Sequence, residues 1–219
     1  MPHSTLEVSN LSKAFQKQSL FENVNLQIHS GEICALVGKN GMGKTIFLKC
    51  ILGYEPFDDG EVTIAGHHLN NREQIRLHSA YIPSDGHDLC DLLTPLEYYR
   101  FIIAVYQLPE KETLLYASEL SVQLGIESHL ERLMKELSFG TKKKALLLGA
   151  LLYDPALLIC DEIFEGLDQS SVEAVISLFQ ERARNNRSVL FTTHLQDLLE
   201  AVSTVVYRIE NNQIMQIAK

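Results

Sequence analysis

The sequence predicts an α/β fold with a mostly parallel sheet, an antiparallel β-subdomain at the N-terminus and an inserted α-helical subdomain. Short apolar runs that favour strands alternate with runs that favour helices, and this alternation is typical of a parallel sheet covered on both faces. The first two strand-like runs have no helical run between them, which predicts the antiparallel addition. Residues 86–150 favour helices and interrupt the alternation.

The N-terminal part of the chain is predicted to be rich in strands. Its strand-like runs either alternate between apolar and polar residues or are apolar throughout, as half-buried and fully buried strands are. Asp58, Asp59 and Gly60 give a turn signal. We predict strands at residues 6–8, 24–28, 33–37 and 61–65, the end of a strand at 81–83, and a helix at 46–52.

The middle of the chain carries clear helix signals. Thr94 suits an N-cap, Pro95 the first helical position and Glu97 the third, so a helix begins here and continues to about residue 107. A second helix is predicted from about residue 109 to 124, where Gly125 stops it. We divide the single domain, 1–219, into a helical subdomain at 86–150 and a core formed by 1–85 and 151–219.

The alternation resumes towards the C-terminus. Apolar runs again predict strands, and the runs between them predict helices. Asn211 and Asn212 suit a hairpin turn. We predict strands at 156–160, 188–192, 204–209 and 213–217, and helices at 170–184 and 195–202.

The most informative segment follows the predicted strand 33–37. Residues 38–45 read Gly-Lys-Asn-Gly-Met-Gly-Lys-Thr and fit G-x-x-x-x-G-K-[ST], the phosphate loop of nucleotide triphosphatases. Glycines let backbone N–H groups turn towards a phosphate, and the following helix N-terminus adds positive potential. Lys44 is expected to reach the β- and γ-phosphates, and the Thr45 hydroxyl to hold Mg²⁺. The sequence therefore predicts a P-loop NTPase.

A pair of acids forms the second motif. Four apolar residues, 157–160, lead into Asp161 and Glu162. Asp161 at the strand end is placed to bind Mg²⁺, directly or through water, and Glu162 to polarise the attacking water as general base. The alternative is that both acids merely end a strand in solvent, and the apolar run after a phosphate loop argues against it.

Composition restricts the classes of function. The 219 residues carry a net charge of −9 and a pI of about 5.4, which argues against a general nucleic-acid-binding surface. We expect no signal peptide, because no basic segment followed by an apolar run opens the chain. The longest apolar runs, 101–106 and 145–153, are too short to span a bilayer. The four cysteines lack metal-ligand spacing, and we expect reduced, buried thiols.

Three further motifs resemble those of ATP-binding cassette (ABC) ATPases, in the order in which that family carries them. Residues 137–141, Leu-Ser-Phe-Gly-Thr, resemble the signature motif L-S-G-G-Q. Residues 166–168, Gly-Leu-Asp, resemble the D-loop, and His194 resembles the switch histidine. The resemblance covers nearly the whole chain and implies a Mg²⁺-dependent ATPase.

The resemblance also implies a dimer in which two nucleotide-binding domains sandwich two ATP molecules head to tail. In each copy the nucleotide would be bound by Gly38, Asn40, Gly41, Gly43, Lys44 and Thr45. Ser138 and the backbone of Gly140 would contact the γ-phosphate held by the opposite copy. Ser138 also suits a plain helix N-cap, and both interpretations can hold.

Three positions keep two interpretations each. The resemblance implies that His194 contacts the γ-phosphate and positions the water beside Glu162; otherwise it is a lone histidine at a strand end. Asp168 would cross the dimer interface, or it caps the next helix. Phe15 lies where the family places an aromatic that stacks on adenine, but Phe15 or Phe21 would also suit the core.

The chain departs from the family pattern at several positions. The family usually has a Gln that binds Mg²⁺ after the Tyr-Ile-Pro at 81–83, and this chain has Ser84. Ser84 would hold Mg²⁺ with a shorter reach, through water, with Asp85 or His87 as substitutes. Phe139 and Thr141 replace a Gly and the Gln of the signature, but Ser138 and Gly140 are kept, so ATP sandwiching is expected to survive. The Ser84 change is expected to affect coupling and the rate of hydrolysis.

Three lysines, 142–144, follow the signature. This arrangement resembles ABC ATPases of export-type (ABC-2-like) systems. Three lysines in the first turns of a helix oppose its dipole, which suggests an anionic neighbour such as ATP across the interface. The alternative is a solvated basic helix start.

We therefore expect a cytoplasmic ATPase subunit that docks on the inner face of the membrane through a separate permease. Docking is expected in a groove between the core and the helical subdomain, around 84–100, with Asp88, Leu89, Leu92 and Tyr98 as candidates. Export is favoured over import, also because the chain ends soon after the hairpin. Two alternatives stay open, namely a non-transport ABC ATPase and a regulatory nucleotide-binding subunit with weak hydrolysis.

Overall fold

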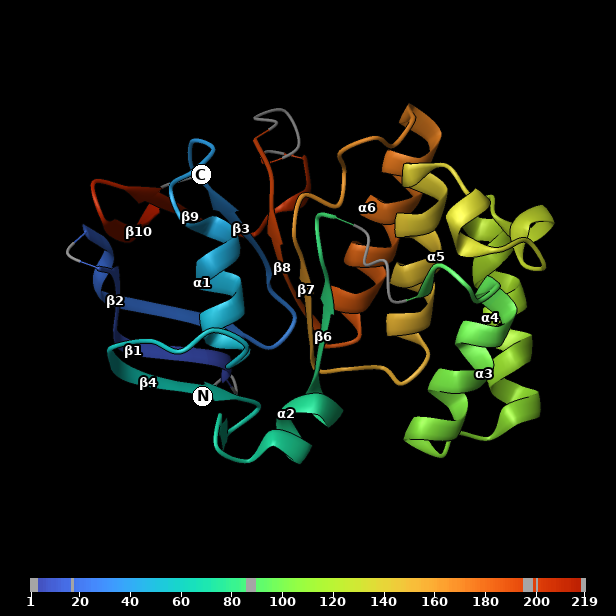
Figure 1. Ribbon diagram of the computed structural model, residues 1–219, viewed down its shortest axis with the longest axis horizontal. Helices are drawn as coiled ribbons and strands as arrows, with labels where there is room; N and C mark the ends of the chain where they lie inside the picture. Colours follow the sequence, from blue (N-terminus) through green and yellow to red (C-terminus); the bar gives the residue numbers. More distant parts are fainter. Residues whose placement is uncertain (1–3, 17, 86–89, 195–198, 200, 218–219) are drawn as a thin grey trace.

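Two sheets organise the molecule. The computed structural model describes residues 4–16, 18–85, 90–194, 199 and 201–217. Its strands form a four-stranded sheet in the order β2-β1-β4-β5 and a six-stranded sheet in the order β10-β9-β3-β8-β7-β6 (Figure 1). This arrangement confirms the predicted α/β fold with a mostly parallel sheet and an antiparallel addition.

The antiparallel sheet is built on the N-terminal hairpin. β1 pairs with β2 on one side and with β4 on the other, antiparallel in both cases. Each of the first two strands is longer than predicted and continues through exposed polar residues beyond its apolar run. The strands are β1 (Ser4–Phe15), β2 (Gln18–His29), β4 (Asp59–Ile64) and β5 (His67–His68).

The larger sheet is parallel except at one edge. β3, β6, β7, β8 and β9 run in the same direction, and β10 returns antiparallel to β9 through the predicted turn at Asn211 and Asn212. β3, β7 and β8 are buried along their whole length. The strands are β3 (Ile33–Val37), β6 (Ser79–Ile82), β7 (Leu157–Cys160), β8 (Ser188–Thr192), β9 (Val205–Glu210) and β10 (Gln213–Ile217).

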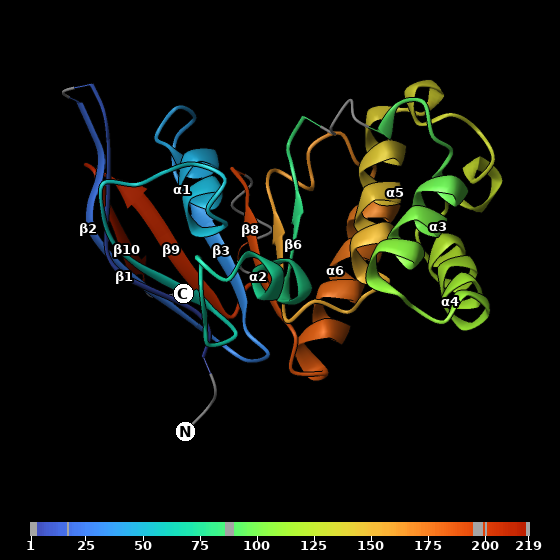
Figure 2. The same cartoon turned by 60° about the horizontal axis from the view of Figure 1, so that its bottom comes forward.

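Alternate side chains of the central strands enter two different hydrophobic cores. Cys34 and Leu36 of β3 join one core with α1 and the antiparallel sheet, whereas Ile33 and Ala35 join the other with the helices α3–α6. This follows from the two-residue period of a strand. The parallel sheet is thus covered by α1 and a second sheet on one face and by helices on the other (Figure 2).

The helices agree with the sequence where capping signals are strong. Thr94 and Glu97 form the predicted capping box of α3, with both backbone hydrogen bonds present. α2 was not predicted, because Ile75 is its one buried residue and it lacks an apolar stripe. The predicted helix at 195–202 lies mostly outside the described residues. The helices are α1 (Lys44–Ile51), α2 (Arg72–His78), α3 (Pro95–Tyr106), α4 (Glu110–Gln123), α5 (Phe139–Leu151) and α6 (Gln169–Arg184).

Two expectations from the sequence composition can be compared with the structure. None of the described helices is both long and apolar enough to cross a membrane. Cys34, Cys50 and Cys160 are buried as free thiols, whereas Cys90 is only partly buried. Burial raises the pKa of the Cys50 thiol to about 11, which keeps it protonated and unreactive at neutral pH.

Candidate active site

The site lies where three parallel strands end. β3 leads into the loop 38–43, β7 into Asp161 and Glu162, and β8 into Thr193 and His194. Because β3 and β7 both pair with β8 in parallel, their carboxyl ends meet at one edge of the sheet. The sequence predicted each of these segments, and the topology explains why they converge.

Glycines shape the loop before α1. A Cβ placed on Gly38 would lie 2.3 Å from the Ile209 side chain and 2.9 Å from the Ile209 carbonyl oxygen, so no larger residue fits there. Gly43 has a φ of 91°, in the left-handed region that favours glycine, and it serves as the N-cap of α1. The loop therefore depends on glycine for packing at one end and for backbone conformation at the other.

Lys44, the first residue of α1, lies almost fully buried between the loop and β7. Its ammonium donates a 2.8 Å hydrogen bond to the Gly38 carbonyl and lies 3.6 Å from Oε1 of Glu162. The cation and a carboxylate of the site are therefore close enough to attract each other.

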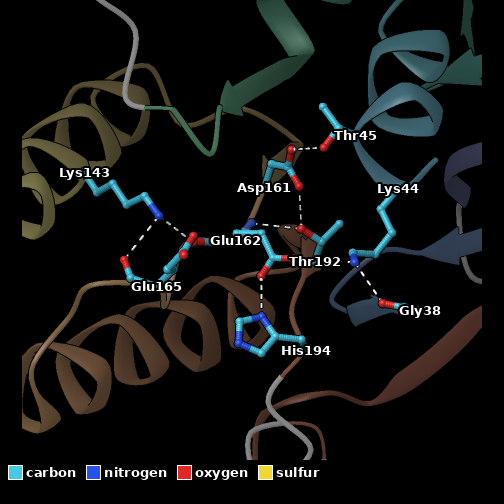
Figure 3. A network of polar contacts seen from close by, with 9 residues as sticks. All are labelled: Gly38, Lys44, Thr45, Lys143, Asp161, Glu162, Glu165, Thr192 and His194. Carbon is cyan, nitrogen blue, oxygen red and sulfur yellow. Dashed lines mark hydrogen bonds and ion pairs between the residues drawn. The ribbon is translucent and has the colours of Figure 1, made fainter. Parts of the chain in front are cut away.

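A buried network holds Asp161 at the centre of the site (Figure 3). Oδ2 of Asp161 accepts a 2.6 Å hydrogen bond from the Thr45 hydroxyl, and Oδ1 accepts one of 2.6 Å from the Thr192 hydroxyl. The Thr192 oxygen in turn accepts from the Glu162 N–H at 2.8 Å. Asp161 is fully buried, and a buried carboxylate requires such donors.

Thr192 belongs to the candidate site and was not predicted from the sequence. The available signal was its position, because Thr192 is a polar residue at the carboxyl end of an apolar strand. It had no motif to single it out, because its role depends on the pairing of β7 with β8.

Glu162 and His194 face each other across the opening of the site. Nδ1 of His194 lies 3.2 Å from Oε2 of Glu162, and the histidine side chain is half-exposed whereas that of the glutamate is mostly buried. The backbone of Glu162 has a φ of 49°, which costs about 1–2 kcal/mol for a residue with a Cβ. Such strain persists only where the surroundings hold it.

Most of the predicted site residues line one cleft of about 510 Å³. Glu165 and Leu20 also line it without having been predicted. Phe15 is 44% exposed, which contradicts its assignment to the core, while Phe21 is fully buried. The predicted residues that line the cleft are Phe15, Asn40, Gly41, Gly43, Lys44, Thr45, Ser84, Glu162 and His194.

The remaining predicted residues lie outside this cleft. Ser138 is the N-cap of α5, and its hydroxyl accepts a 3.2 Å hydrogen bond from the Thr141 N–H. A Cβ on Gly140 would lie 2.6 Å from the Gly166 carbonyl oxygen, so the signature and the D-loop segment are in close contact. Ser138 is exposed at the helix start.

Asp168 caps α6, as one of its two interpretations required. Its carboxylate accepts hydrogen bonds from the Ser171 N–H at 2.8 Å and the Ser170 hydroxyl at 3.0 Å. The hydrogen bond from the Ser171 backbone is the main reason why the pKa of Asp168 lies below its usual value. An interface role for Asp168 stays a prediction.

The three lysines after the signature are bound within the chain. Lys142 pairs with the Asp91 carboxylate, and Lys144 donates a 2.8 Å hydrogen bond to the Ser171 hydroxyl. Lys143 donates to the carbonyl oxygens of Glu162 and Glu165. The alternative of a solvated basic helix start is therefore wrong, and the lysines need no anion across an interface to account for them.

A second, more apolar cleft of about 870 Å³ is lined by residues of α2, β6, α3 and α5. Tyr98, one of the predicted docking residues, lines it, and Leu92 is 75% exposed. Asp88 and Leu89, like His87, lie outside the described residues. The tyrosines that line the cleft are Tyr54, Tyr81, Tyr98, Tyr106 and Tyr153.

The sequence of this chain is similar to those of known ATP-binding proteins. A sequence model of the family described as ABC transporter matches residues 21–165. The cytochrome c biogenesis ATP-binding export protein CcmA of Hahella chejuensis is 30% identical over 189 residues, which are 86% of this chain and 88% of that protein. The methionine import ATP-binding protein MetN of Clostridium tetani is 24% identical over 95% of this chain, which spans 67% of that protein.

The fold is similar to that of solved structures as well. One, described as the structure of the ATP-binding subunit of an ABC transporter, has a TM-score of 0.91 and 30% sequence identity. The match covers 98% of this chain and 90% of that chain.

Proposed function

The chain belongs to the ABC transporter family as an ATP-binding subunit, and from this premise we propose that it is a Mg²⁺-dependent ATPase that powers a separate membrane permease. The observation that carries the proposal is the convergence of Lys44, Thr45, Glu162 and His194 on one cleft, with the buried Asp161 carboxylate hydrogen-bonded to the Thr45 hydroxyl. Phosphate binding, metal binding and base catalysis each have a suitable group there.

The loop and α1 would bind the phosphates of ATP. Backbone N–H groups at Gly41 and Gly43 and the N-terminus of α1 favour negative charge. The Thr45 hydroxyl and the Asp161 carboxylate, 2.6 Å apart, are the hard oxygen donors that suit Mg²⁺, and Ser84 lines the same cleft. When bound, the ion would neutralise charge on the β- and γ-phosphates.

Glu162 would act as the general base. Water attacks the γ-phosphorus, its proton passes to the Glu162 carboxylate, and the bond to the ADP oxygen breaks. The γ-phosphate would compete with Glu162 for Lys44, so that nucleotide binding frees the carboxylate for water. His194, 3.2 Å from Oε2 of Glu162, would orient this carboxylate and contact the γ-phosphate.

Two copies of the domain would complete the sites. Ser138 and Gly140 lie outside the cleft of their own chain and at the start of α5, which supports their use by an opposite copy. An exposed helix N-terminus there would stabilise a phosphate. Asp168, beside the signature segment, would lie at the same interface. We propose a head-to-tail dimer, formed with a second copy or a related chain.

The permease would bind the tyrosine-rich cleft between α2 and α3. The exposed surface of the cleft is mostly apolar, and residues of both the core and the helical subdomain line it. Docking there would place the chain on the cytoplasmic face of the membrane. The proposed direction is export, supported by the export protein of Hahella chejuensis and by the lysines after the signature; the methionine import relative is the opposing observation.

The experiment that tests the function is steady-state ATP hydrolysis by the purified chain with Mg²⁺, beside Glu162→Gln. We expect turnover that falls at least about a hundredfold in the variant, in line with the loss of a general base. Light scattering with ATP should show a stable dimer of Glu162→Gln, because ATP is trapped. Unchanged phosphate release in the variant would overturn the role of Glu162, and absent turnover in the parent would favour a regulatory subunit.

Co-purification separates the transport function from its non-transport alternative. A tagged chain should retain an integral membrane protein in mild detergent. The direction of transport can be measured in vesicles that hold this complex with the ATPase subunit on the outside. For an exporter, ATP added outside should drive the substrate into the vesicles.

A further inference from the structure

Lys143 is a buried cation that the proposed mechanism does not use. It belongs to α5 and is fully buried. Its ammonium donates hydrogen bonds to the carbonyl oxygens of Glu162 at 2.6 Å and of Glu165 at 3.2 Å, and it lies 4.3 Å from the centre of the Phe139 ring. Burying an ammonium without compensation is costly. These contacts provide the compensation for Lys143.

The contacts converge on the turn that carries the proposed base. The Glu162 carbonyl oxygen accepts from Lys143 and also from the Glu165 N–H at 3.1 Å. The Glu162 N–H donates to the Thr192 hydroxyl. Both backbone groups of Glu162 are thus held while its φ is 49°. Because the direction of the Cα–Cβ bond follows from the backbone, these bonds fix the direction in which the Glu162 side chain leaves the chain.

Lys143 approaches this turn from a different element. Figure 3 shows Lys143 and Glu165 to the left of Glu162, Lys44 to its right and His194 below it. α5, which carries Lys143, starts at the signature motif, whereas Glu162 follows β7. One side chain therefore connects the signature helix with the backbone of the proposed base.

Its two neighbours do not make this connection. Lys142 pairs with Asp91, and Lys144 donates to Ser171 at the start of α6. The three adjacent lysines contact three different parts of the chain, and Lys143 is the one that reaches the backbone of Glu162.

We propose that Lys143 is a positioning residue for hydrolysis: it holds the carbonyl of Glu162 so that the carboxylate faces the cleft, and it makes this orientation depend on the position of α5. The inference rests on the proposed role of Glu162 as general base. In a head-to-tail dimer the signature of one copy contacts the nucleotide of the other. Lys143 would then let the occupancy of the opposite site influence the base of its own site.

The test is Lys143→Met, which keeps an unbranched side chain one atom shorter than that of lysine and removes its hydrogen-bond donors. We expect kcat for ATP to fall at least about tenfold, because two bonds from a charged donor are lost, while the Kd for ATP changes less than about threefold. Lys142→Met is the matched control, since Lys142 has the same chemistry on the same helix turn, and its kcat should stay within about threefold of the parent. An unchanged kcat in Lys143→Met overturns the proposal.

A double variant separates positioning from general stability. If Lys143 acts through Glu162, then Lys143→Met lowers kcat in the parent but not the residual rate of Glu162→Gln. A merely structural role would lower the residual rate as well, or would weaken ATP binding in both backgrounds, and either result overturns the proposal.

The failure of this inference differs from that of the proposed function. Turnover that is lost in Glu162→Gln and retained in Lys143→Met refutes the inference alone. Turnover that is insensitive to Glu162→Gln refutes both. If Lys143→Met does not fold, Lys143→Gln, which has a shorter amide donor, is tested in its place. A kcat about threefold or more below that of Lys142→Gln supports the proposal. Equal kcat values in these two variants overturn it.

Discussion

Thr192 and Asp161 form a buried hydrogen bond of 2.6 Å between the ends of two neighbouring parallel strands. Neither side chain is accessible to solvent. The same hydroxyl accepts the Glu162 N–H, so one threonine positions both acids of the site. The bond therefore links the proposed metal-binding group to the proposed base without any contact between their carboxylates.

Replacing Thr192 with Val should impair both stability and turnover. The change keeps the shape of the side chain but leaves a buried carboxylate oxygen and a buried N–H without this partner, which costs about 1–3 kcal/mol each. We expect the free energy of unfolding to fall by about 2 kcal/mol or more and kcat by at least about tenfold. Urea denaturation and phosphate release measure the two effects. Thr192→Ser, which keeps the hydroxyl, should retain most of the activity; a similar loss there would argue against the hydrogen bond as the cause.

Substitution by Ala should weaken nucleotide binding at Phe15 and lower the stability of the fold at Phe21. Phe15 is 44% exposed at the cleft, so its loss should raise the Kd for ATP by about fivefold or more, as expected for one base stacked on an aromatic ring. Phe21 is fully buried, so its loss should lower the free energy of unfolding by about 3–5 kcal/mol. Nucleotide titration and denaturation of both variants check this pair. Phe15→Tyr should bind ATP like the parent, and equal Kd values for Phe15→Ala and the parent would exclude stacking.

Asp168 should stabilise the fold in a pH-dependent way. Hydrogen bonds from Ser171 hold the pKa of Asp168 below its unfolded value, so the charged cap contributes stability above the unfolded pKa, about 3.9, and loses it as the pH falls through the folded pKa. The urea midpoint of Asp168→Ala should lie below that of the parent at pH 7, and the difference should narrow as the pH falls below about 4. A constant difference would contradict a charge effect.

Asp168→Asn separates the cap from the interface. Asn is also a good N-cap, so the stability of this variant should stay close to that of the parent at pH 7. A lower kcat despite normal stability would then support the proposed role of Asp168 at the dimer interface, and normal values of both would leave capping as its function.

Ser84→Gln should lower the Mg²⁺ concentration that ATP hydrolysis requires. Ser84 lines the cleft, and a longer amide side chain would reach a cation that serine reaches only through water. One added polar contact of about 1 kcal/mol lowers the Mg²⁺ concentration for half-maximal turnover about fivefold. Turnover measured against Mg²⁺ at fixed ATP shows this, with Ser84→Ala as control. An unchanged Mg²⁺ requirement in Ser84→Gln would place Ser84 away from the ion.

The sequence predicted those parts of the site that short segments specify. The residues 38–45 need only their own glycines and the following helix, and Asp161 and Glu162 follow directly from an apolar strand. Thr192 was missed because its role requires knowledge of which strands pair. The partners of Lys142 and Lys144 were missed for the same reason: Asp91 and Ser171 are distant in sequence, and a charge run does not reveal its own neighbours.

The elements that escaped prediction lack a local signal. α2 buries Ile75 alone, and therefore has no apolar stripe by which to recognise it. β1 continues through exposed polar residues because β2 and β4 pair with it on both sides. Long-range hydrogen bonds, rather than side-chain pattern, set the ends of these strands.

The division of the central strands between two cores has a consequence for how the protein can evolve. Adjacent residues such as Cys34 and Ala35 belong to different cores, so a substitution that suits one side need not disturb the packing on the other. Substitutions among the helices that border the tyrosine-rich cleft can therefore alter that surface, while the packing around α1 and the phosphate loop is retained. One sheet thus separates the packing beneath the candidate active site from the packing beneath the second cleft, so the two surfaces can change independently.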